Sequence, residues 1–560
     1  MKNPILGVIT SGSLAEGLEM RLHPSHSVEQ VRAGKFVVVE GREFDFFSMI
    51  TDARLDASSQ SILRDPPPGE SLLADVLAGD HTYATVSLKP MLMMQRTAAQ
   101  GRIDREELLR PVKSIPAHFS TVREASREDV NRVFGEEEER SARYFNLGAP
   151  LDMENVEVCL DLDRFIERSN GIFGKTGTGK TFLTRLVLAG LIQGNKAVNL
   201  IFDMHSEYGW QTRSEGDAGN DAFVKGLKNI FAARGNVLIC TLDPESASKR
   251  AVKWDLELRI PLSEIEVEDI APLQEELNLH ATAIETAYIL RNRYNKNWMK
   301  TLLDIPPEEM KDRAEELGAN KESMAALYRK LRAIRDLPFI ADKEEEKIAG
   351  ASSNRVNIAR LINELRSGKH IDLEFGRISS LLAYLLVANL ISRRIHHEWV
   401  KQAEKYMASQ DAKDRPKPLV ITIEEAHKFL NPSAARQTIF GTIARELRKY
   451  FVSLLIVDQR PSGIDDEILS QLGTRITALL NDEKDIQAVF TGVSGAAALR
   501  NVLASLDSKQ QALILGHATP MPIVVKTRHY GEEFYKAMGM KSAEEKTDRL
   551  RKITNLFPEG

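Results

Sequence analysis

The sequence predicts an α/β protein with a parallel sheet, a small β-barrel at its N-terminus and a helical insertion. From about residue 155, apolar strand-like runs alternate with helical patterns, which is typical of a parallel sheet covered by helices. Residues 1–95 instead hold short β-rich runs separated by turn residues, a pattern that fits a small barrel and also a small sandwich. Residues 265–370 interrupt the alternation, because they are rich in Glu, Lys, Leu and Ala and have a helical period.

The expected strands of the first domain are ILGVIT, KFVVVEG, FDFFSMITDARL and YATVSLKPMLMM. Those of the core include VNLIF, LVITI and SLLIV, which are continuously apolar because a parallel sheet is buried on both faces. We expect a β-barrel-like domain over 1–95, a helical connector over 96–154, the first part of the core over 155–264, the insertion over 265–370, the second part of the core over 371–530 and a C-terminal tail over 531–560.

Composition places the chain among globular proteins. Of its 560 residues 42% are hydrophobic and 28% charged, and no apolar run reaches the roughly 18–20 residues that a membrane helix needs. Cys159 and Cys240 are the only cysteines, which excludes a disulfide framework and a cysteine zinc site. We therefore expect a cytoplasmic protein that does not enter a membrane. A net charge of −5 argues against a basic surface coat but is compatible with a locally basic channel for nucleic acid.

The stretch GKTGTGKT predicts a phosphate site, because it satisfies G-x-x-x-x-G-K-[ST] between a strand and a helix. Its backbone N–H groups would surround the phosphates, Lys180 would reach the β- and γ-phosphates, and Thr181 would offer its hydroxyl to Mg²⁺. ATP and Mg²⁺ are therefore the expected cofactors. The residues expected to bind ATP are Gly174, Lys175, Thr176, Gly177, Thr178, Gly179, Lys180, Thr181 and Phe182.

Two carboxylates end the apolar strand of PLVITIEEAH, where unpaired acids would be costly. We expect Glu424 to belong to the metal shell and Glu425 to polarise the attacking water. The alternative is an exposed strand end with ordinary acids. His427 fits a structural position at a helix start as well as a functional one.

Two further strand ends carry polar side chains, and the ends of parallel strands share one edge of the sheet. In IFDMHSEY we expect Asp203, His205 and Glu207 to support the water and metal shell, and a separate metal site is the less favoured alternative. In IVDQRPS we expect Gln459 to contact both the γ-phosphate and the water, and the alternative is an ordinary turn amide.

The segment RQTIFGTIARELRKYF predicts a helix between the carboxylate strand and the strand of Gln459. Arg445 and Arg448 are spaced i, i+3 on it and share a face. Phosphoryl transfer often uses an arginine from a neighbouring subunit, for which Arg448 is the first choice and Arg445 the second. The alternative is a pair of solvated arginines.

Taken in order, GKTGTGKT, DMHSEY, ITIEEAH, IARELRKY and DQRPS resemble the HerA family of the FtsK–HerA division of P-loop ATPases. The resemblance spans most of the chain, since the N-terminal β-rich segment is similar to the barrel of that family. It implies a RecA-like core, a homohexameric ring and the pumping of double-stranded DNA through a central channel. It also implies a partner, either a NurA-like nuclease in DNA end processing or another effector in anti-phage defence. Residue by residue, it makes Lys180 and Thr181 ligands of nucleotide and Mg²⁺, Glu425 the catalytic carboxylate, and an arginine of RELRK the group that serves the adjacent subunit.

Two positions depart from the family pattern, because Glu424 stands where an Asp is usual and Leu447 stands before Arg448 where the family often has Gly. The basic stretches 291–300 and 393–401 are candidates for DNA contact, although an amphipathic helix with solvated lysines and packed aromatic side chains explains each of them better. A different reading of the whole is an ATPase ring that scaffolds or gates a partner enzyme, with DNA pumping secondary.

Overall fold

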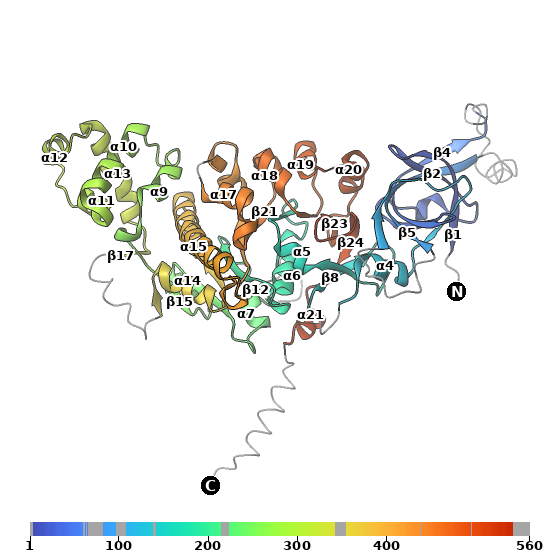
Figure 1. Cartoon of the computed structure of the whole chain (residues 1–560), viewed down its shortest axis with the longest axis horizontal. Helices are drawn as coiled ribbons and strands as arrows, with labels where there is room; N and C mark the ends of the chain where they lie inside the picture. Colours follow the sequence, from blue (N-terminus) through green and yellow to red (C-terminus); the bar gives the residue numbers. More distant parts are fainter. Residues whose placement is uncertain are drawn as a thin grey trace, which may run out of the picture.

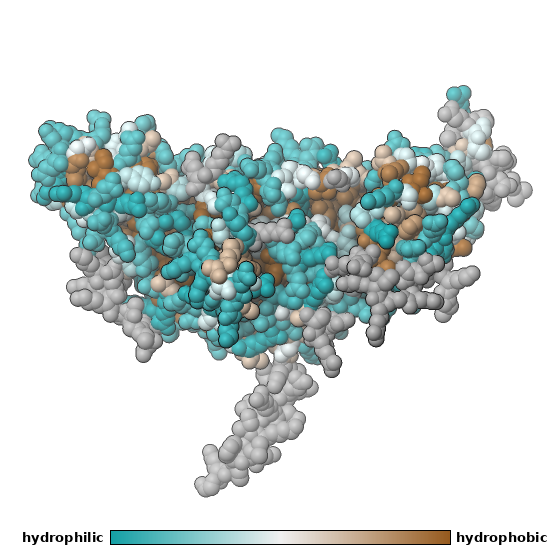
Figure 2. Space-filling model, in the orientation of Figure 1, coloured by the Kyte–Doolittle hydropathy of each residue, from teal (hydrophilic) through white to brown (hydrophobic). Residues whose placement is uncertain are grey.

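The computed structural model describes residues 4–59, 62, 64, 82–96, 108–137, 142–213, 223–341, 354–436, 438–493 and 495–540. Figure 1 shows an elongated molecule with a β-barrel at one end, a helical lobe at the other and the α/β core between them. Among the described helices, none is long and apolar enough to cross a membrane, and the face seen in Figure 2 is mostly hydrophilic. Part of the expected C-terminal tail, residues 541–560, lies outside the described residues.

Six antiparallel strands close into the N-terminal barrel, in the order β2-β1-β7-β3-β4-β5 with β2 paired to β5. The strands of this sheet are β1 (Ile5–Ser13), β2 (Gly17–Leu22), β3 (Phe36–Glu40), β4 (Phe44–Ala57), β5 (Thr82–Gln95), β6 (Leu109–Pro111) and β7 (Thr121–Glu124). On β3, Val37 and Val39 belong to the apolar cluster of the barrel, whereas Phe36 and Val38 join the cluster shared with the α/β core. The four strands expected from the sequence are confirmed.

The barrel does not end at residue 95, and the segment 96–154 is not simply a helical connector. It supplies β6 and β7, then helix α4 (Arg127–Phe134), and then β8 (Tyr144–Pro150), which joins the sheet of the core. Strand β7 lies between β1 and β3 and completes the ring of strands. It escapes a sequence-based assignment because it is only four residues long and its place depends on pairing with distant strands.

The core is one thirteen-stranded sheet in the order β18-β15-β14-β19-β11-β20-β21-β10-β22-β23-β24-β8-β9. The paired strands from β18 to β22 run parallel, and the remaining ones are antiparallel. The strands that follow β8 are β9 (Val158–Asp161), β10 (Asn170–Phe173), β11 (Val198–Asp203), β14 (Val237–Thr241), β15 (Leu256–Leu258), β18 (Arg355–Val356), β19 (His370–Glu374), β20 (Leu419–Glu424), β21 (Val452–Asp458), β22 (Thr474–Thr477), β23 (Gln511–Gly516) and β24 (Ile523–Thr527). Two small separate sheets pair β12 (Thr212–Arg213) with β13 (Phe223–Val224) and β16 (Ile260–Pro261) with β17 (Ile340–Ala341).

Both faces of the sheet are covered, as the continuously apolar strands predict. On β20, Leu419, Ile421 and Ile423 enter one apolar cluster, whereas Val420 between them enters the other. The helices of the core are α5 (Leu162–Ile166), α6 (Lys180–Gln193), α7 (Leu227–Ile230), α8 (Pro244–Lys249), α14 (Ile358–Arg366), α15 (Leu381–Ser409), α16 (His427–Leu430), α17 (Ile439–Glu446), α18 (Asp466–Gln471), α19 (Glu483–Val489), α20 (Ala496–Ala504) and α21 (Glu532–Ala537).

The insertion forms the helical lobe at the end of the molecule away from the barrel (Figure 1). Its helices are α9 (Val267–Ile270), α10 (Ala281–Tyr294), α11 (Trp298–Leu303), α12 (Met310–Glu316) and α13 (Lys321–Arg335). The insertion ends before residue 370, because β18, α14 and β19 return to the core. Strand β19 was not expected, since three of the five residues in HIDLE are polar although all five are buried.

Both basic stretches bury their tryptophan, Trp298 or Trp399, whereas Arg293, Lys296 and Lys401 are exposed. This is the pattern of an amphipathic helix with packed aromatic and solvated basic side chains. Trp298 is 1% exposed and donates its indole N–H to the carbonyl oxygen of Ile265 at 3.0 Å. In the second stretch, the guanidinium of Arg393 bonds to both carboxylate oxygens of Asp269 at 2.8 and 2.9 Å. Arg394 forms a 2.8 Å ion pair with Glu266. These contacts join α15 to the insertion.

We predict that Trp298→Ala destabilises the helical lobe, because it removes a buried aromatic ring and leaves the Ile265 carbonyl unpaired. The expected loss is about 3–5 kcal/mol in the free energy of unfolding, measured by urea denaturation. Met407→Ala, at a site 52% exposed on α15, is the control and should change it by less than about 0.5 kcal/mol. Equal effects of the two substitutions would contradict the packing described.

Candidate active site

The loop between β10 and α6 has the shape that the sequence predicts for a phosphate site. Gly177 and Gly179 adopt φ values of +82° and +95°, in the region that side chains disfavour, and Gly179 directly precedes α6. The hydroxyl of Thr178 donates to the carbonyl oxygen of Lys175 at 2.6 Å and closes the turn. The N–H groups of the first turn of α6 therefore follow directly on this glycine turn. The N-terminus of a helix at such a turn favours the binding of an anion.

Gln459 joins the phosphate loop to the carboxylate strand. Its Oε1 accepts a hydrogen bond from the Thr176 hydroxyl at 2.6 Å, and its Nε2 donates to Oε1 of Glu425 at 3.1 Å. This is possible because β21, which Gln459 follows, lies between β10 and β20. Glu425 has a φ of +48°, which is uncommon for a residue other than glycine.

Glu424 is buried beside the loop and keeps one oxygen without a partner. Its Oε1 accepts from the Tyr208 hydroxyl at 2.7 Å, while Oε2 has no hydrogen-bond partner. Burial, with the nearby charge of Asp203, raises the pKa of Glu424 to about 8, and the charge of the half-buried Lys180 opposes this. A cation close to this carboxylate would favour its ionised form.

Thr181 lies beside a second carboxylate, since its hydroxyl donates to Oε2 of Glu207 at 2.8 Å. The free oxygen of Glu424, the Thr181 hydroxyl and Glu207 are all oxygen donors, the ligand type that Mg²⁺ prefers. The residues present therefore fit a magnesium ion, which Thr181 and Glu424 would hold with nucleotide phosphates.

The acidic turn after β11 is ordered by Asp203. Its two oxygens accept from the backbone N–H groups of Glu207 and Tyr208, both at 2.9 Å, which brings these two side chains to Thr181 and Glu424. His205 is exposed, and it does not join Asp203 and Glu207 in a group with metal-ligand spacing among the described residues. Asp203 and Glu207 therefore lie in one turn beside Thr181 and Glu424, whereas His205 is exposed. The supporting role of the three residues stays a prediction.

The expected arginine helix is shorter than predicted. Helix α17 begins at Ile439, and residues Leu447–Tyr450 form a 3₁₀ turn, so Arg445 and Arg448 do not lie on one α-helix. Arg445 donates to the carbonyl oxygen of Ala435 at 3.2 Å and lies 4.0 Å from Glu467. The side chain of Arg448 lies outside the described residues.

Phe182 follows the phosphate loop and is 40% exposed, although it is a large apolar side chain. Its ring lies 6.0 Å from that of Tyr530, and the guanidinium of Arg185 lies over both rings. An exposed ring beside the loop is consistent with the expected contact to nucleotide.

A hydrogen-bonded contact between a histidine and a buried aspartate supports the turn after β20, and sequence reasoning did not identify it. Asp458, fully buried at the end of β21, accepts from the backbone N–H of His427 at 2.7 Å and from its Nδ1 at 3.0 Å. The hydrogen bond to Asp458 raises the pKa of His427 above 6.5. The sequence signal was the aspartate before Gln459 in VDQRPS, but its partner is 31 residues away.

We predict that the His427–Asp458 contact stabilises the fold mainly at low pH. Because the folded chain holds the His427 proton more tightly than the unfolded chain, its contribution is complete below pH 6.5 and is lost as pH rises through the folded pKa. The loss of unfolding free energy caused by His427→Gln should therefore be larger at about pH 5.5 than at about pH 8.5. A loss independent of pH, measured by urea unfolding, would refute a charged His427.

Both main domains of the chain resemble known proteins. Two family models match the chain, the central domain of helicase HerA over residues 145–395 and the HAS barrel domain over residues 6–110. The chain is 26% identical to the DNA double-strand break repair helicase HerA of Sulfolobus acidocaldarius, over 73% of each chain. It is 23% identical to the protein of the same name from Pyrococcus furiosus, over 77% of each chain. VirB4 of Thermoanaerobacter pseudethanolicus overlaps with a TM-score of 0.44 at 14% identity, over 70% of this chain and 98% of that one. With both domains matched in their order along the chain, this protein belongs to the HerA family of P-loop ATPases.

Proposed function

We propose that this chain is an ATP-driven motor that moves along double-stranded DNA. The observation that carries the proposal is the run of hydrogen bonds from Thr176 through Gln459 to Glu425. It links the loop that would hold the γ-phosphate to the carboxylate that would activate water, through one neutral amide. Such an amide can respond to the loss of the γ-phosphate and transmit it to the next strand.

Each residue has a distinct task in the proposed hydrolysis. Lys180 binds the β- and γ-phosphates, Gln459 orients the attacking water, and Glu425 accepts its proton as the water attacks the γ-phosphate. Magnesium, held by Thr181 and Glu424, supplies positive charge that neutralises the phosphates.

The motor is proposed to be a homohexameric ring in which nucleotide lies between two copies. An arginine of RELRK, Arg448 before Arg445, would stabilise the charge that develops at the neighbour's site. Within this segment α17 ends at Glu446 and passes into a 3₁₀ turn over Leu447–Tyr450.

The names of the relatives support DNA as the substrate, because both curated proteins described above are DNA double-strand break repair helicases. We propose a partner of the same kind as the family resemblance implies, a NurA-like nuclease or another effector in anti-phage defence. Work on chromosomal or invading DNA would take place in the cytoplasm.

We predict that duplex DNA raises ATP turnover by the wild-type protein and that the protein displaces a blocking group from duplex DNA. Glu425→Gln should still bind ATP but turn it over at least about a hundredfold more slowly, because it lacks the proton acceptor. Lys180→Ala should lose hydrolysis while keeping the fold, as circular dichroism would verify.

Wild-type turnover that duplex DNA leaves unchanged, with assembly that depends on a partner, would favour the ring that gates another enzyme. Hydrolysis at the full rate in Glu425→Gln would show that another group accepts the proton.

We further predict that two inactive variants restore activity when mixed. Arg448→Ala keeps its own phosphate loop and needs only the neighbour's arginine, which Lys180→Ala subunits still carry. Mixed rings should therefore hydrolyse ATP although each variant alone does not. If no mixing ratio restores turnover in verified mixed assemblies, Arg448 does not act between subunits, and the same test is then applied to Arg445→Ala.

A further inference from the structure

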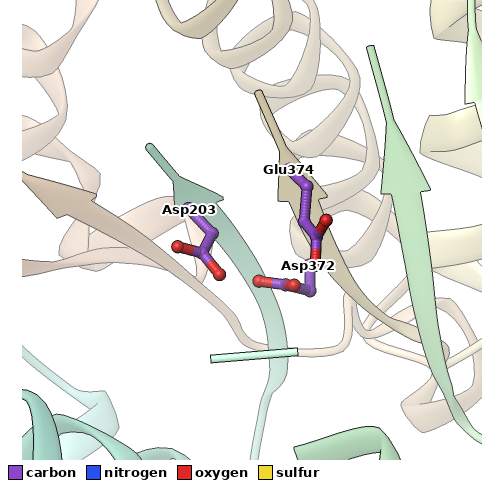
Figure 3. A group of neighbouring side chains, drawn as sticks. All are labelled: Asp203, Asp372 and Glu374. Atoms are coloured by element: carbon purple, nitrogen blue, oxygen red, sulfur yellow. The ribbon is translucent and has the colours of Figure 1, made fainter. Parts of the chain in front are cut away.

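A second group of acidic side chains lies next to the nucleotide site, on the adjacent strands β11 and β19. Asp203 ends β11 and pairs in register with Glu374, and Asp372 lies two residues earlier on β19. None of the three is exposed to solvent. One oxygen from each lies within 4.8 Å of the others, and Figure 3 shows their carboxylates gathered at one place.

Two of these carboxylates are fixed by partners but keep free acceptor capacity. Asp203 accepts one backbone N–H on each oxygen, from Glu207 and Tyr208, and a carboxylate oxygen can accept a second bond. Oε2 of Glu374 accepts from the Arg250 guanidinium at 2.6 Å, whereas its Oε1 has no hydrogen-bond partner.

Asp372 provides the separate observation that points to a ligand. Both of its oxygens lack a hydrogen-bond partner although the side chain is 0% exposed, and its carboxylate is directed toward that of Asp203 (Figure 3). Oδ2 also lies against Gly209, where an added Cβ would approach it to 2.0 Å. A buried carboxylate without any partner is costly, so this position requires either a proton or a cation.

Charge and distance both fit one divalent ion. Three carboxylates beside the single guanidinium of Arg250 leave two negative charges, which a divalent cation balances. Bonds from Ca²⁺ to oxygen are roughly 2.3–2.6 Å long, so ligands on opposite sides of one ion lie up to about 5 Å apart. The spacing within 4.8 Å therefore suits a single ion. Hard cations such as Ca²⁺, Mn²⁺ and Mg²⁺ prefer carboxylate ligands.

We propose that Asp203, Asp372 and Glu374 bind one divalent cation that does not require nucleotide. This ion differs from the magnesium that would accompany ATP, whose donors are Thr181 and Glu424. It would tie β11 to β19 and fix the turn that begins at Asp203. In that turn Glu207 accepts a hydrogen bond from Thr181, and Tyr208 donates one to Glu424. The ion would therefore also fix the positions of these residues at the nucleotide site.

The test is a titration of EDTA-dialysed, nucleotide-free protein with Mn²⁺, with the free ion measured by electron paramagnetic resonance. Wild type should bind one ion per chain, and Mn²⁺ should raise its thermal unfolding temperature. Asp372→Asn keeps the size of the side chain and breaks no hydrogen bond, and it should weaken this binding at least about tenfold. Glu374→Gln is a second variant with the same expected loss.

Thr181→Ala is the matched control, since it removes the hydroxyl proposed for the nucleotide's magnesium and should bind Mn²⁺ like wild type. Absence of binding in nucleotide-free wild type would overturn the proposal and assign protons to the cluster. Unchanged Mn²⁺ affinity in both Asp372→Asn and Glu374→Gln would overturn it as well. Because neither ATP nor DNA is present, failure of the proposed motor activity would leave this result unaffected.

Discussion

The order of the central parallel strands decides which polar side chains meet. Strand β21 lies between the strand that carries the phosphate loop and the strand that carries Glu424 and Glu425. Since parallel strands end at one edge of the sheet, the residue that follows β21 reaches both neighbours. Gln459 therefore contacts Thr176, which lies 283 residues away in the sequence. A change in strand order would separate the phosphate loop from Glu425, the group that we propose activates water, even with every side chain retained.

Burial of acidic groups is the second constraint on this edge. Asp203, Asp372 and Glu424 are buried on neighbouring strands, and burial together with repulsion from nearby carboxylates raises the pKa of each. Positive charge close to them is therefore favourable, whether it comes from Lys180 or from metal ions. Bound cations would add to the charge of Lys180 and favour the ionised carboxylates, which couples the order of the site to its ligands.

Local patterns were enough to locate the main parts of the candidate site, because these parts are contiguous in the sequence. GKTGTGKT and the Glu424–Glu425 pair lie within single turns or strand ends, and the alternation of strands and helices predicted the sheet. Contacts between distant segments could not be predicted in this way. Strand β19 was missed because Asp372 and Glu374 make a buried strand resemble a polar segment. His205 was expected at the site, but the turn that Asp203 organises leaves it exposed.

The central claim is that ATP is cleaved where two copies of this chain meet, so that each site is incomplete in a monomer. The most direct measurement is ATP turnover per chain over a dilution series, with the mass of the assembly determined at each concentration. The account predicts that turnover per chain falls together with the loss of the ring. A monomer that hydrolyses ATP at the full rate at every dilution would contradict it.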